Sequence, residues 1–155
     1  MGEAAAGASP AVERRALLRA SAAEKMVQGL VGAVLAGALA LGLAVTPSPD
    51  GTGTHTILGL PPCGMLVAMG RPCPTCGVTT SFVLAAHGRF GDALMNQPFG
   101  LAVFFLVFGG LALAVATLLA GRSWLPLLTP YRVGVAAGAL LVLAMVSWAY
   151  KWATI

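Results

Sequence analysis

The stretch that decides the fold is residues 99–120, which read FGLAVFFLVFGGLALAVATLLA. Thr117 is the only polar side chain among these 22 residues. A helix rises about 1.5 Å per residue and needs about 20 residues to cross the hydrocarbon of a bilayer. Residues 99–120 are therefore predicted to form a transmembrane helix.

Two further apolar runs predict two further spans, at residues 29–45 and 133–150. The first run contains no polar residue, and Ser147 is the clearly polar residue of the second. A signal-peptide core is about 7–15 residues long, so we expect 29–45 to remain as an uncleaved span. Small residues in these runs let another helix approach closely. The expected partners are the lipid bilayer and either a membrane protein or a second copy of this chain.

The overall composition agrees with a membrane protein. Of 155 residues, 58% are hydrophobic and 9% are charged, whereas ordinary soluble domains are about 45–50% apolar and about 25% charged. This composition excludes a soluble monomer and a disordered chain. The net charge of +4 comes from sparse, unclustered residues, so we expect no nucleic-acid partner.

The distribution of Lys and Arg predicts the orientation. Six of the nine lie in residues 1–28 and 121–132, which places both segments in the cytoplasm. The expected fold is an all-α membrane protein with three transmembrane helices and a re-entrant or interfacial helical hairpin on the outer side. Its segments are a basic N-terminal part (1–28, with a helix over 12–25), the first span (29–45), an outer Cys/Pro/Gly-rich segment (46–98), the second span (99–120), a cytoplasmic loop (121–132) and the third span (133–150).

The outer segment contains every cysteine and histidine of the chain: His55, Cys63, Cys73, Cys76 and His87. Short helices are predicted at 75–87 and 92–96. The C-x-x-C pair would then lie at the first turn of a helix, where the dipole lowers a thiol pKa. This arrangement indicates a thiol redox pair with Cys73 as the nucleophile. No βαβ pattern surrounds it, which excludes a thioredoxin fold.

Two other interpretations of the cysteines stay open. Cys63, Cys73, Cys76 and His87 offer four ligands to zinc or another metal that prefers soft ligands. Alternatively, Cys63 forms one structural disulfide with Cys73 or Cys76, and the third thiol packs as a small apolar side chain. His55 is expected to be a solvated loop residue.

Three phrases in this region resemble a known family: RPCPTCGVTT at 71–80, HGRFGDAL at 87–94 and NQPFG at 96–100. They resemble a bacterial domain-of-unknown-function family of small membrane proteins with a C-P-x-C-G-x-T-R motif, over about residues 63–120. Thr80 stands where much of the family has Arg. The resemblance implies a multi-pass protein of the bacterial cytoplasmic (inner) membrane and leaves its activity open.

The absence of certain residues and motifs excludes several classes of function. They contain no ionisable residue, which transporters and proton relays need, and the chain contains no common hydrolase or phosphate-binding motif. We therefore expect a small accessory or scaffold protein, a subunit of a complex, whose outer Cys-rich segment has a structural or metal-binding role. The alternative is a membrane thiol-disulfide oxidoreductase that uses Cys73 and Cys76.

Overall fold

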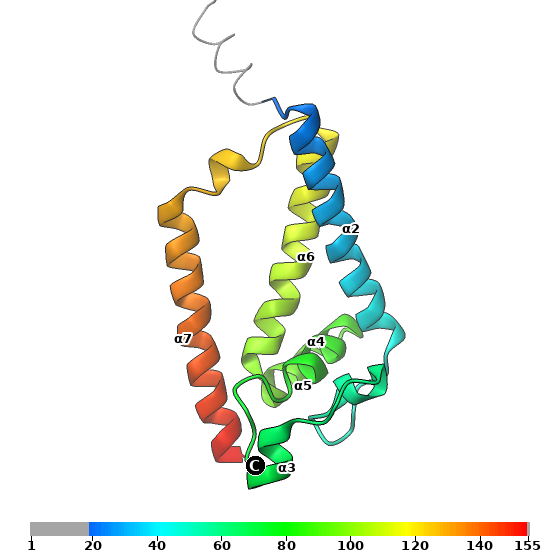
Figure 1. The fold of residues 1–155 in the computed structure, drawn as a ribbon, viewed down its shortest axis with the longest axis vertical. Helices are drawn as coiled ribbons and strands as arrows, with labels where there is room; N and C mark the ends of the chain where they lie inside the picture. Colours follow the sequence, from blue (N-terminus) through cyan, green and yellow to red (C-terminus); the bar gives the residue numbers. More distant parts are fainter. Residues whose placement is uncertain (1–18, 155) are drawn as a thin grey trace, which may run out of the picture.

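A computed structural model describes residues 19–154, whose fold consists of helices joined by loops (Figure 1). Within this range the only β-type pairing is an isolated bridge between Arg19 and Arg122. Three helices are long and apolar enough to cross a membrane: α2 (Ala22–Ala44), α6 (Pro98–Leu119) and α7 (Pro130–Thr154). The shorter helices are η1 (Thr54–Leu58), α3 (Gly64–Met69), α4 (Val78–Ala86), α5 (Phe90–Asn96) and η2 (Leu125–Leu127). The predicted fold class, an all-helical multi-pass membrane protein, is confirmed.

The helix ends depend on capping as much as on hydropathy. α2 begins at Ala22, ahead of the predicted residue 29, because Ser21 and Glu24 form a capping box in which each side chain bonds the other residue's backbone N–H. α7 extends beyond the predicted 133–150 at both ends, and the Thr129 hydroxyl accepts from the Arg132 N–H near its start. Of the helix predicted over 12–25, residues up to 18 lie outside the described range.

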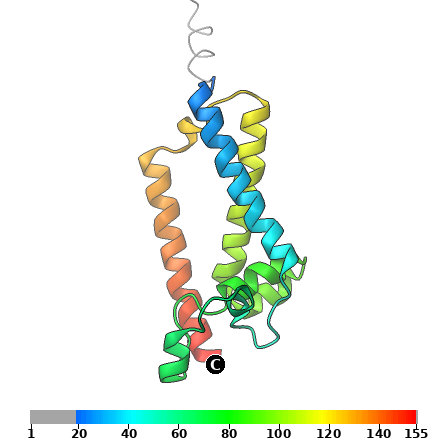
Figure 2. The same cartoon turned by 45° about the vertical axis from the view of Figure 1, so that its right-hand side comes forward.

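α2 and α6 pack as an antiparallel pair along their lengths (Figure 2). Gly32 faces Ala114, and a Cβ on Gly110 would lie 3.2 Å from the Leu35 side chain. At one end of this pair the Ala20 N–H donates to the Gly121 carbonyl at 3.0 Å. The start of α2 and the connection from α6 to α7 therefore share one end of the protein. The cysteine-bearing segment occupies the opposite end.

The short helices α4 and α5 form the predicted hairpin and pack on α6 and α2. Their core contains Leu84, Ala85, Ala93 and Phe104. Gly100 of α6 sits directly against α4: a Cβ there would lie 2.6 Å from the Ser81 Cβ and 2.7 Å from the Val78 carbonyl oxygen. This close approach holds the hairpin across the end of the α2–α6 pair.

α7 stands apart from α2 and α6 over much of its length (Figures 1 and 2). Its C-terminal part is anchored to the cysteine-bearing segment. The Trp148 indole N–H donates to the Pro72 carbonyl at 3.1 Å, and the Tyr150 hydroxyl donates to the Met95 carbonyl at 2.8 Å. The Arg71 guanidinium lies 4.6 Å above the Trp152 ring. Aromatic side chains near the C-terminal end of α7 thus fix this helix to the cysteine-bearing segment.

Candidate metal centre

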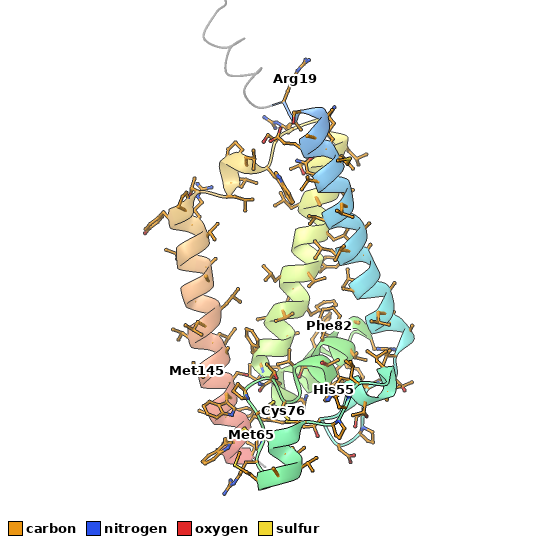
Figure 3. All side chains as sticks on the ribbon, in the orientation of Figure 1. Arg19, His55, Met65, Cys76, Phe82 and Met145 are labelled. Atoms are coloured by element: carbon orange, nitrogen blue, oxygen red, sulfur yellow. The ribbon has the colours of Figure 1, made fainter. Side chains whose placement is uncertain are left out.

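Three free thiols meet at the end of the protein that carries the short helices. The Sγ atoms of Cys63, Cys73 and Cys76 all lie within 4.8 Å of one another. Cys76 is buried, whereas Cys63 and Cys73 are partly exposed. Figure 3 shows Cys76 between the short helices and the C-terminal part of α7. In residues 19–154 this is the only group of three or more His, Cys, Asp or Glu side chains whose ligand atoms lie close enough together to hold one metal ion.

Local backbone geometry brings the thiols together. Cys63 is the N-cap residue of α3, and Gly70 ends that helix with φ of +64°. The chain then turns back through the buried Pro72 into a tight turn, in which the Cys76 N–H donates to the Cys73 carbonyl at 3.0 Å. The Thr75 hydroxyl lies 3.3 Å from the Cys73 sulfur. The turn after α3 and the turn through Cys73 and Cys76 thus bring the three thiols together.

The expected position of the C-x-x-C pair was wrong. Gly77 takes the left-handed conformation, with φ of +86°, and α4 starts only at Val78. Cys73 and Cys76 therefore lie in the turn before the helix rather than in its first turn. Burial raises the pKa of the Cys76 thiol to about 12, which is opposite to the lowering that a helix N-terminus gives.

Cys63 is instead the most acidic of the perturbed thiols. The backbone N–H of Leu66, in the first turn of α3, lowers the pKa of Cys63 to about 7, and the neighbouring thiols of Cys73 and Cys76 add to this effect. A thiolate is thus available at neutral pH on a partly exposed residue. The sequence interpretation made Cys73 the nucleophile and did not identify Cys63 as the acidic thiol.

Alkylation of the reduced, metal-free protein tests this order of acidity. Because the thiolate is the reactive species, iodoacetamide should modify Cys63 at a rate that rises with pH and is half-maximal at about pH 7. Cys76 should stay unmodified at that pH. Peptide mass spectrometry over a pH series measures both rates. Equal rates at Cys63 and Cys76 near neutral pH would contradict the assignment.

The thiol cluster fits a tetrahedral metal ion. Zinc binds cysteine sulfur at about 2.3 Å, so two sulfurs on one zinc ion are about 3.8 Å apart. Separations within 4.8 Å need only small side-chain rotations to reach this geometry. The three cysteines supply three ligands and leave a fourth position to an external ligand.

The two histidines do not join the cluster. The Nδ1 of His87 lies 2.9 Å from the Val83 carbonyl oxygen at the end of α4. His55 lies in η1. The structure therefore brings together three of the four predicted ligands, namely Cys63, Cys73 and Cys76, and leaves His87 bound to its own helix.

A polar network beside the cysteines was not expected. Lys151 of α7 is only 5% exposed, and its Nζ donates to the Asn96 side-chain oxygen at 2.8 Å. The Asn96 amide in turn donates to the Gly77 carbonyl at 3.2 Å and to the Ser81 hydroxyl at 2.9 Å. Lys151 lies one residue beyond the predicted third span (133–150). Its spacing of four residues from Ser147 was a usable signal, because both then share one face of a helix.

The same face of α7 makes a second buried contact through Ser147. Its hydroxyl donates to the Gln97 side-chain oxygen at 2.9 Å and accepts from the Phe99 N–H at 3.0 Å. Thr80, which replaces the Arg of the resembled motif, is also buried, with its hydroxyl 2.8 Å from that of Thr54. Position 80 therefore faces the interior between α4 and η1, and in this chain a small hydroxyl occupies it.

No curated protein and no solved structure matches the chain. A family model does match residues 63–111, which hold the three cysteines, the short helices α3 to α5 and part of α6. The expected resemblance is thus confirmed: this segment matches the family described as a protein of unknown function (DUF2752).

Proposed function

We propose that this protein is a membrane metal-binding protein in which Cys63, Cys73 and Cys76 hold one thiophilic ion. Zinc is the first candidate for this ion. The observation that carries the proposal is the meeting of three free sulfurs within 4.8 Å, from two segments of the chain. His87 is left out of the ligand set because its ring contacts the Val83 carbonyl. Metal binding deprotonates a coordinating thiol, so it would also recruit the buried Cys76.

The role we propose is that of a small accessory or scaffold subunit. Three protein ligands leave one position for a water molecule or for a ligand from a partner. The ion would also hold α3 to the turn that precedes α4. We further propose a bacterial inner membrane with a cytoplasmic N-terminus, on the basis of the Lys and Arg distribution and of the resemblance.

Metal analysis of the purified protein tests this function. We expect about one zinc ion per chain, and we expect Cys76→Ser to lose it, because two thiols hold zinc far more weakly than three. His87→Ala is the matched control: it removes a candidate ligand outside the cluster and should retain the ion. Reduced protein that takes up no zinc would contradict the proposal.

A thiol-disulfide oxidoreductase is the second candidate, favoured by the acidity of Cys63. Its thiolate would attack a substrate disulfide and release one substrate thiolate. Cys73 or Cys76 would then displace the second substrate thiol and leave an internal disulfide, which a dithiol reductant reopens. The same protein preparations can distinguish this candidate. It would be favoured if the purified protein contains no metal and its thiols react with an alkylating agent only after reduction.

A further inference from the structure

Lys151 is a buried cation whose hydrogen-bond partner is neutral. It is 5% exposed, and its ammonium donates to the side-chain amide oxygen of Asn96. Within residues 19–154 the one ion pair between a basic side chain and a carboxylate joins Arg89 to Asp92 at the surface. Burying an ion without a counter-charge is strongly unfavourable. An anion close to Lys151 would relieve this penalty.

The turn over residues 73–77, called the cysteine turn below, carries two of the three thiols and is where such an anion can form. A Cβ on Gly77, the residue after Cys76, would lie 3.4 Å from the Lys151 Cε. A Cβ on Gly51 would lie 3.5 Å from the Lys151 Nζ. The Lys151 side chain therefore lies against Gly77, the residue that follows Cys76 in the turn.

The charges define the kind of ion that would fit. Three coordinated thiolates carry three negative charges, and Lys151 contributes one positive charge. A divalent cation brings the assembly to neutrality, which a buried site favours because net charge is poorly solvated there. Resting on the function proposed above, we infer that Lys151 is the fixed counter-charge of the Cys63–Cys73–Cys76 centre and that the centre takes a divalent thiophilic cation of the zinc class.

Asn96 holds the counter-charge in place. Its oxygen accepts from Lys151, while its amide group donates to the Gly77 carbonyl and to Ser81. The ammonium is thus tied to the backbone of the turn that supplies two of the three sulfurs. Lys151 acts through the thiolates as a positioning residue and does not contact the ion.

The test compares two probes on the full-length reduced protein in detergent, zinc and arsenite. Zinc with three thiolates forms a complex of net charge −1. Arsenite reacts with three thiols, releases three water molecules and leaves a neutral product. Lys151→Met should therefore weaken zinc binding by about 10–100-fold, the usual effect of losing a group that supports metal ligands. Its affinity for arsenite should stay within a few-fold of the wild type.

Two variants control for structural effects. Lys25→Met makes the same substitution at an exposed lysine at the far end of α2 and should leave zinc binding unchanged. Ser147→Ala loosens the anchor of α7 without changing charge and should also bind zinc normally.

The outcomes separate the two proposals. Equal losses of zinc and arsenite in Lys151→Met, or a zinc affinity that does not change, would overturn the role of Lys151 while the metal site stands. An equal loss of zinc in Ser147→Ala would overturn it as well, because anchoring alone would then explain the effect. A wild-type protein that binds no zinc would instead refute the proposed function.

Discussion

Gly100→Ala should destabilise the protein by about 3 kcal/mol, because the new methyl group has no space between α6 and α4. Its Cβ would lie 2.6 Å from the Ser81 Cβ and 2.7 Å from the Val78 carbonyl oxygen. The second of these is a backbone atom, so the helices themselves have to separate. For a chain of this size, we expect the Tm in detergent to fall by about 6–12 °C.

The matched control is Gly109→Ala in the same helix. A Cβ at Gly109 meets no atom within 4 Å, and alanine is the better helix former. Thermal unfolding followed by circular dichroism should therefore show little change for this variant. Equal shifts for the two substitutions would mean that the contact between Gly100 and α4 does not hold the hairpin in place.

Gly77→Ala should weaken zinc binding by about tenfold or more. Gly77 has φ of +86°, a conformation that is unfavourable by about 1–2 kcal/mol for a residue with a side chain. A Cβ there would also lie 3.0 Å from the Gly51 carbonyl oxygen. Relief of both strains moves the turn that carries Cys73 and Cys76, and about 1.4 kcal/mol corresponds to a tenfold change in affinity.

Gly53→Ala separates backbone strain from damage to the site. Gly53 has a similar φ of +79°, but a Cβ there meets no atom within 4 Å. We expect this variant to lose stability without losing zinc affinity, measured by competition with a chromophoric chelator. If it weakens zinc binding as much as Gly77→Ala, the effect does not arise at the cysteine turn.

The features that sequence predicted well are those encoded locally. Each span is a continuous apolar run, so its existence and approximate position follow from hydropathy alone. The start of α2 was missed even though the signal is local, because the Ser21–Glu24 capping box lies outside the apolar run. The hairpin of α4 and α5 was also predictable, because glycines at 88 and 91 separate the helical patterns expected at 75–87 and 92–96. In the structure the turn is shorter, and α5 begins at Phe90.

The chemistry of the site depended on facts that sequence does not carry. A glycine tolerates both signs of φ, so the sequence could not show that Gly77 ends the cysteine turn and delays α4. The three thiols meet through two turns of the chain, whereas spacing alone left the disulfide, metal and redox interpretations open. Lys151 reaches Asn96 across 55 positions of sequence, and such a contact is visible only in the folded chain.

The attachment of α7 at one end gives this protein an unusual mechanical property. A membrane span packed along its whole length has its tilt set by its neighbours, whereas one free over most of its length adjusts its tilt to bilayer thickness. The pivot of α7 is the part that contains Trp148 and Lys151, which bond to the Pro72 carbonyl and to Asn96. Thickening or thinning of the membrane would therefore turn this helix about a point beside the three cysteines, and lipid composition would bear directly on the geometry of the thiols.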